Sequence, residues 1–153
     1  MSDDPQRRRV YKFEDMWPRF GEQSLNRAHY RLAVRAACDY YSVPYPTVTF
    51  LPWQTRGDGA WYEPDTHKMY LRKQNYCNMA VALHEAAHAI ESHLFGDKYD
   101  AHGPVWLGIY FWLLVKMGEA PHVALQATAK RHRLKYRSLR ASSPTVLRRK
   151  AKD

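Results

Sequence analysis

Features of secreted, disulfide-linked and membrane-spanning proteins are scarce in this sequence. Its 153 residues include only two cysteines, Cys38 and Cys77, too few for a disulfide framework or a four-cysteine zinc ribbon. The longest apolar run, residues 105–115, is shorter than the roughly 20 residues that cross a bilayer. The N-terminal residues MSDDPQRRR lack the apolar stretch of a secretory signal. We therefore expect a cytoplasmic protein with reduced thiols and no membrane insertion.

Positive charge is concentrated at one end of the chain. The formal net charge is +9. Residues 130–153 contain ten Lys and Arg residues and a single acid, Asp153, whereas residues 1–129 contain 14 residues of each sign. A cationic segment of this kind binds nucleic acid or an acidic partner, or stays solvated. Nucleic-acid binding through residues 130–152 and a solvated tail are therefore both open.

Sequence periodicity predicts one α+β domain. A helix is expected from Ser24, its N-cap, with an apolar face that includes Leu25 and Leu32. Residues 47–51, 60–63 and 67–72 read as strands, and a Pro-Asp turn joins the last two into a hairpin. Further helices are expected at residues 76–95, 104–117 and from 121 onward. We expect a small three-stranded antiparallel sheet, packed with helices. The chain divides into an N-terminal segment (1–20), a main domain (21–129) and a basic tail (130–153).

The helix expected at residues 76–95 carries the chemistry. Its apolar stripe consists of Tyr76, Ala80, Leu83, Ala87, Ile90 and Leu94. An H-E-x-x-H motif lies within it, and residues four apart on a helix have Cβ atoms about 5–6 Å apart. His84 and His88 can therefore bind one zinc ion together. Glu85 lies on a neighbouring face, where it can act as a general base. Two solvated histidines on a surface helix are the alternative interpretation.

A catalytic zinc ion needs a third protein ligand and an open position for water. Four candidates follow the motif: Glu91, His93, Asp100 and His102. Glu91 is a short carboxylate one turn further along the helix, and His93 points roughly 140° away from His88. Asp100 is expected in a loop. His102 is favoured because a Gly-Pro pair starts a helix directly after it, which would hold the imidazole in place.

HEAAH at residues 84–88 is followed, after a gap of 13 residues, by HGPVW at residues 102–106. These two motifs resemble those of the SprT-like zinc metallopeptidases, which include the Spartan proteases. Family members carry H-E-x-x-H and then H-G-x-x-aromatic after a similar gap. The resemblance covers residues 24–117. It implies a small α+β catalytic domain, Zn²⁺ bound by His84, His88 and His102, and Glu85 as the catalytic base. Many members carry a C-terminal zinc ribbon, which the basic tail replaces here.

Two functions follow from these features. The first is a zinc metalloendopeptidase that cleaves protein or peptide substrates, among them nucleic-acid-associated proteins. The second is a DNA-binding or regulatory module with a structural or catalytically silent zinc site. The intact Glu85 and an open fourth ligand position favour the peptidase.

A peptidase also needs a group that stabilises the oxyanion and a surface that holds the substrate backbone. Tyr62, Tyr70 and Tyr110 are candidates for the first role, and the sequence does not choose among them. The substrate is expected along an exposed strand edge, at residues 60–63 or 67–72.

Overall fold

The computed structural model describes residues 4, 6–15, 24–118 and 120–137. The elements, in chain order, are α1 (Arg7–Asp15), α3 (Arg27–Tyr40), β1 (Thr47–Phe50), β2 (Ala60–Glu63), β3 (Lys68–Leu71), the 3₁₀ turn η1 (Gln74–Tyr76), α4 (Met79–Phe95), α5 (Pro104–Lys116) and α6 (His122–Arg131). The predicted α+β fold with a three-stranded sheet is confirmed. Most of the basic tail, residues 138–153, lies outside the described residues. So do Trp17, Pro18 and Phe20, which the sequence suggests as anchors of the N-terminal segment onto the main domain.

The sheet is mixed, so the expectation of a wholly antiparallel sheet was wrong. Its strand order is β1-β3-β2. β2 and β3 form the predicted antiparallel hairpin, with Trp61 opposite Tyr70, whereas β1 runs parallel to β3, with Val48 opposite Met69. The chain reverses direction once between β1 and β2 and again within the hairpin, which leaves β1 and β3 pointing the same way. β3 is consequently central, and β2 is an edge strand.

Helix α3 differs from its prediction in both its start and its buried face. Its N-cap is Asn26, whose side-chain oxygen accepts a hydrogen bond from the backbone N–H of His29 at 2.7 Å. Ser24 instead forms an isolated β-bridge with Asn78. Leu32 is 56% exposed, and the buried residues are Tyr30, Ala33, Val34, Ala37 and Cys38. The helix has two apolar faces, and packing against α4 buries the one that includes the large Tyr30 ring.

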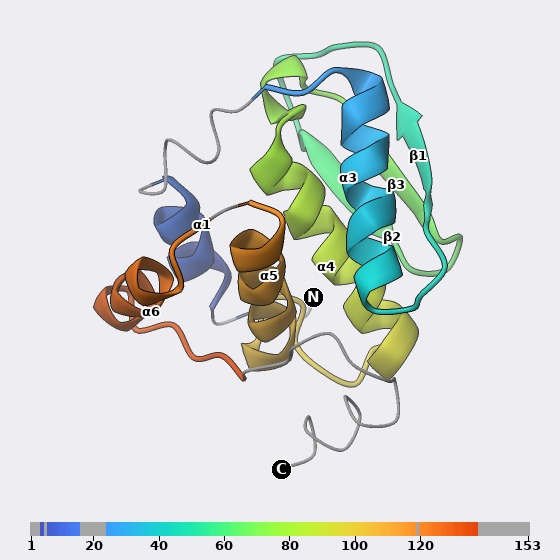
Figure 1. Cartoon of the computed structure of the whole chain (residues 1–153). Helices are drawn as coiled ribbons and strands as arrows, with labels where there is room; N and C mark the ends of the chain where they lie inside the picture. Colours follow the sequence, from blue (N-terminus) through green and yellow to red (C-terminus); the bar gives the residue numbers. More distant parts are fainter. Residues whose placement is uncertain (1–3, 5, 16–23, 119, 138–153) are drawn as a thin grey trace.

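Helix α4 lies at the centre of the molecule. It packs against α3 on one side and α5 on the other, and it also contacts β2 (Figure 1). The Asn78 side chain caps its start by accepting a hydrogen bond from the N–H of Val81 at 2.9 Å. Gly96, with φ of 64°, ends it. Leu83, Ala87, Ile90 and Leu94 of the predicted stripe are buried, while Tyr76 lies in the turn before the helix.

Helix α5 and the segment that follows α6 lie close together. Pro104 occupies the first turn of α5, as predicted. The backbone N–H of Arg137 donates to the carbonyl of Pro104 at 2.9 Å. A Cβ atom on Gly108 would lie 1.7 Å from the carbonyl oxygen of Arg137, so only glycine permits this approach. The start of α5, which follows His102, is thereby covered by the C-terminal part of the described chain.

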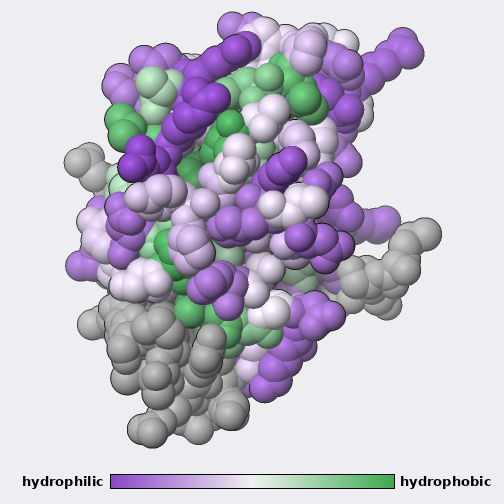
Figure 2. Space-filling model, turned by 90° about the vertical axis from the view of Figure 1, so that its right-hand side faces the viewer, coloured by the Kyte–Doolittle hydropathy of each residue, from purple (hydrophilic) through white to green (hydrophobic). Residues whose placement is uncertain are grey.

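Arginines cover aromatic rings on the side of the molecule that carries β1. The guanidinium of Arg27 lies 4.9 Å from the ring centre of Trp53, and that of Arg35 lies 4.7 Å from the ring centre of Tyr45. Figure 2 shows hydrophobic residues on this side in small groups between hydrophilic ones. Among the described residues, no helix combines the length and apolar character needed to cross a membrane.

Candidate metal centre

Three histidines from two elements meet at one point. His84 and His88 come from α4, and His102 lies directly before α5. The Nε2 atom of His84 is 3.2 Å from Nε2 of His88 and 3.3 Å from Nε2 of His102. Ligand atoms of all three lie within 4.8 Å of one another, close enough to bind one metal ion. The structure thus brings together the two motif histidines and the favoured third candidate.

The opposite ring nitrogens of two of these histidines face carboxylates. Nδ1 of His84 lies 2.6 Å from Oε1 of Glu14, and Nδ1 of His102 is hydrogen-bonded to Oδ2 of Asp4. A carboxylate accepts a hydrogen bond from Nδ1–H, so a neutral imidazole in this position keeps its proton on Nδ1 and its lone pair on Nε2. In their neutral forms, His84 and His102 therefore direct Nε2 lone pairs toward the same point. This donor arrangement fits a bound cation.

These carboxylates were not predicted from the sequence, because both belong to the N-terminal segment. Glu14 lies on α1, and Asp4 lies three residues before it. Gln6 anchors the segment: its amide donates to the carbonyl of His102 at 3.0 Å and accepts from the N–H of Lys135 at 2.7 Å. The N-terminal sequence does contain one indication of a shared role. Its polar residues Asp4, Arg7, Tyr11 and Glu14 are spaced by three, four and three residues, the spacing of one helical face.

Burial and neighbouring charges shift the pKa values of all three imidazoles. Burial, together with the neighbouring imidazoles of His84 and His102, holds the pKa of His88 well below its ordinary value. Burial and His84 also lower the pKa of His102. Burial lowers the pKa of His84 too, but the Glu14 carboxylate outweighs this effect and raises it. The cluster therefore favours neutral imidazole, the form that binds metals, at two of its three positions.

Glu85 lies beside the histidines in a buried position. It lines the same cleft as His84 and His88. Burial raises the pKa of its carboxyl to about 7, against the opposing effect of His84. A carboxyl group whose pKa lies near neutrality can both accept and release a proton under physiological conditions.

The remaining candidates for the third ligand lie outside the three-histidine cluster found among the described residues. His93 and Asp100 are exposed. Glu91 is buried, and burial raises the pKa of its carboxyl to about 9. Its Oε1 atom has no hydrogen-bond partner within the described part of the chain. Glu91 is thus a neutral acid at pH 7, which is a poor metal ligand.

The histidines open onto a cleft of about 800 Å³. Strand β2 contributes Ala60, Trp61 and Tyr62 to one wall, and the loop between α4 and α5 contributes residues 96–102. Arg7 and Tyr11 of α1 line it as well. Of the two strands considered for substrate binding, only β2 is an edge strand, since β3 is paired on both sides.

The three tyrosines considered for oxyanion stabilisation are engaged elsewhere. Tyr70 stacks on Trp61, with ring centres 5.2 Å apart, and does not line the cleft. Tyr110 is buried, and its hydroxyl donates to the carbonyl of Ala80 at 3.4 Å. Tyr62 lines the cleft, but its hydroxyl lies 2.8 Å from Nδ1 of His67.

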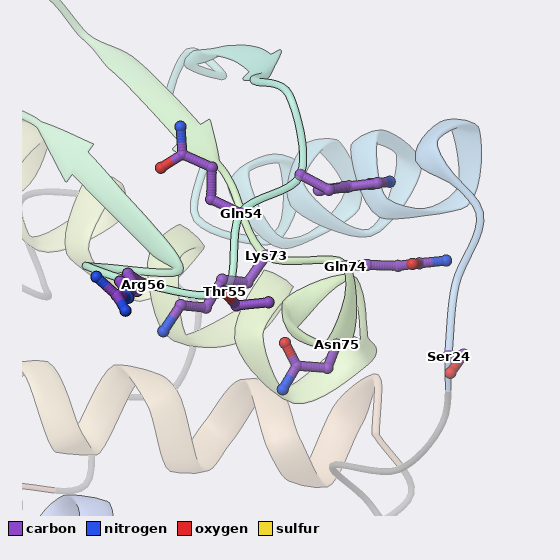
Figure 3. Close-up of a pocket in the computed structure, with 8 residues that line it drawn as sticks. Ser24, Gln54, Thr55, Arg56, Lys73, Gln74 and Asn75 are labelled. Carbon is purple, nitrogen blue, oxygen red and sulfur yellow. The ribbon is translucent and has the colours of Figure 1, made fainter.

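A second hollow, of about 960 Å³, shares no lining residue with the histidine cleft. Its lining consists of Ser24, Trp53, Gln54, Thr55, Arg56, Lys73, Gln74 and Asn75. Figure 3 shows Arg56 and Gln74 pointing away from each other. Among the described residues, this lining holds no histidine, cysteine or carboxylate, so the candidate metal ligands and general base lie in the histidine cleft.

Comparison with known proteins yields no match: no family model, curated protein or solved structure matches the chain. The function is therefore inferred from the chemistry of the site.

Proposed function

We propose that the protein is a zinc-dependent metallopeptidase that hydrolyses peptide bonds. The observation that carries this proposal is the convergence of three imidazole Nε2 atoms, 3.2 and 3.3 Å apart, beside a buried glutamate. These groups line a cleft that is bordered by an edge strand. A metal site, a general base and a place for an extended peptide are thus adjacent.

His84, His88 and His102 would hold the metal ion. Imidazole suits several transition metals, and three-histidine sets are typical of catalytic zinc. When bound, zinc supplies a Lewis acid that polarises the scissile carbonyl and makes a water molecule more acidic. A structural zinc site is closed by four protein ligands, whereas the cluster among the described residues has three. This difference favours the peptidase over a structural zinc site, and the retained Glu85 favours it over a silent one.

Glu85 would act as the general base. Its buried carboxylate accepts a proton from the attacking water and passes it to the nitrogen of the leaving amine. It follows His84 directly in the buried part of α4, so the helix would hold it beside the metal ligands.

The substrate would bind along β2. An edge strand has backbone N–H and C=O groups that can pair with an extended peptide. Because β2 forms one wall of the cleft, such a peptide would pass the histidines. The HEAAH and HGPVW motifs both lie at this site and support assignment to the SprT-like metallopeptidases as part of the proposal. Action on nucleic-acid-associated proteins stays a prediction that rests on the basic tail.

The test compares two Glu→Gln variants on the same helix. Glu85→Gln should keep its zinc and lose at least about 10²-fold in cleavage of an unfolded substrate such as casein, the typical effect of removing a general base. Glu91→Gln is the matched control: it is also buried in the cleft, and its neutral acid is nearly isosteric with glutamine. Equal activity of wild type and Glu85→Gln would contradict the proposal, as would a zinc-loaded wild type that cleaves no peptide.

A further inference from the structure

One face of the N-terminal helix α1 is directed at the metal centre. Arg7, Tyr11 and Glu14 lie on this face, and Asp4 lies three residues before the helix. Asp4 and Glu14 hydrogen-bond His102 and His84, so the two residues between them are held beside the same histidines. The ring centre of Tyr11 is 5.7 Å from that of His102 and 6.4 Å from that of His84. Tyr11 is therefore positioned by the same contacts that orient the metal ligands.

The hydroxyl of Tyr11 is arranged to donate a hydrogen bond into the cleft. It accepts a hydrogen bond from Nε of Arg7 at 3.2 Å, which occupies a lone pair and leaves its proton for another acceptor. Tyr11 is 40% exposed and lines the cleft together with Arg7, Glu85 and His102. The hydroxyls of Tyr62 and Tyr110, by contrast, are bonded to His67 and to the Ala80 carbonyl.

We propose that Tyr11, held by Arg7, is a catalytic residue that hydrogen-bonds the carbonyl oxygen of the scissile peptide bond as negative charge develops on it. This inference rests on the proposed peptidase function. As water attacks, a new C–O bond forms and the electron pair of the carbonyl π bond moves onto the carbonyl oxygen. Glu85 takes the proton of the water. Tyr11 keeps its own proton and donates a hydrogen bond. When the C–N bond breaks, the electron pair on oxygen re-forms the carbonyl, the C–N pair goes to the nitrogen, and Glu85 passes its proton to that nitrogen.

Arg7 is a positioning residue in this scheme. Its guanidinium fixes the hydroxyl and places positive charge next to it, so its effect passes through Tyr11. In a double-mutant cycle, Arg7→Met should lower kcat in the wild type and have little further effect in a Tyr11→Phe background. Arg7→Lys, which keeps the charge, should restore part of the loss. Additive effects of the two substitutions would overturn the role given to Arg7.

The main test removes the Tyr11 hydroxyl and, as a control, the hydroxyl of a second tyrosine that is also paired with an arginine but lies away from the cleft. Tyr45 is 42% exposed, and its hydroxyl accepts a hydrogen bond from Nη2 of Arg35 at 3.4 Å, but it does not line the cleft. Tyr11→Phe should lower kcat by about 10²-fold, the loss seen for one oxyanion donor, with KM and zinc content unchanged. Tyr45→Phe should match wild type.

A binding measurement separates a catalytic from a structural role. A phosphinic peptide carries a tetrahedral, negatively charged centre that imitates the transition state. Its affinity for the zinc-loaded protein should fall in Tyr11→Phe by about the same factor as kcat, while the affinity for a product peptide stays unchanged. Loss of zinc or of product binding in Tyr11→Phe would overturn the inference.

Failure of this inference can be distinguished from failure of the proposed function. If zinc-loaded wild type cleaves casein, and Tyr11→Phe keeps full kcat and full affinity for the phosphinic peptide, Tyr11 has no catalytic role and the peptidase stands. If zinc-loaded wild type cleaves nothing and does not bind the phosphinic peptide, both proposals are overturned.

Discussion

Nδ1 of His84 lies 2.6 Å from Oε1 of Glu14, although 70 residues separate the two in the sequence. His102 has the same relationship with Asp4 across 98 residues. Both carboxylates come from the N-terminal residues, which therefore form part of the candidate metal centre. In the proposed site they would fix which ring nitrogen of each histidine faces the metal position.

This relationship predicts that Glu14 and Asp4 control metal affinity. Glu14→Gln and Asp4→Asn should each weaken zinc binding by about 10–100-fold, the usual effect of removing such a partner. Competition with a chromophoric chelator measures the change. Asp97→Asn, an exposed residue on the rim of the same cleft, is the control and should leave the affinity unchanged. Wild-type affinity in both carboxylate variants would contradict the tautomer argument.

Trp106 packs against the rings of all three histidines. It is fully buried, and its ring centre lies 4.7 Å from that of His84, 5.0 Å from that of His88 and 4.8 Å from that of His102. Trp106→Ala should cost about 3–5 kcal/mol of unfolding free energy in the metal-free protein, and Trp106→Phe should cost less. Urea unfolding measures both. A change of less than 1 kcal/mol for Trp106→Ala, well under the usual cost of such a cavity, would show that the tryptophan is not packed as described.

Glu91 makes the stability of the metal-free protein depend on pH. Burial raises the pKa of its carboxyl to about 9, so the folded state keeps this proton at pH values where the unfolded state has released it. Its contribution is complete below about pH 4.5 and is lost as the pH rises toward 9. Glu91→Gln removes this dependence and should raise the unfolding free energy at pH 8 by on the order of a few kcal/mol, since one pKa unit corresponds to about 1.4 kcal/mol.

Urea unfolding of the metal-free wild type and Glu91→Gln at pH 5 and pH 8 provides this comparison. The difference between the two proteins should be small at pH 5 and large at pH 8. An equal difference at both pH values would show that Glu91 is not protonated in the folded state.

The basic tail predicts salt-dependent binding of single-stranded DNA. Five of its basic residues lie between residues 138 and 153: Arg140, Arg148, Arg149, Lys150 and Lys152. Each phosphate contact contributes about −0.7 to the slope of log affinity against log salt concentration for a single strand. Deleting residues 138–153 should weaken binding and make this slope shallower. An unchanged slope would favour the solvated tail.

The residues of the site that were predicted from the sequence are those marked by short-range sequence patterns. The H-E-x-x-H spacing lies within one helix, and Pro104 marks the start of α5 directly after His102. Glu14 and Asp4 escaped prediction because their roles come from tertiary contacts that span 70 and 98 residues. Helical periodicity indicates which residues share a face, but not what that face meets.

In the fold, too, features with a local sequence pattern were predicted, and features set by tertiary packing were not. The three strands were visible in their composition, whereas the parallel pairing of β1 with β3 depends on how the chain returns between strands. Helix α3 offered two apolar faces, and packing against α4 decided between them. Leu32, which fits one of these faces, is exposed for that reason.

The most direct test of the three-histidine site is the zinc content of purified protein after reconstitution and dialysis, measured by mass spectrometry. Wild type should retain about one zinc ion per chain, as expected for a single site, and His84→Ala, His88→Ala and His102→Ala should each lose most of it. His93→Ala, an exposed histidine on the same helix, and Glu85→Gln should retain it. A wild type without zinc, or a His102→Ala variant that keeps all of it, would contradict the assignment of this site.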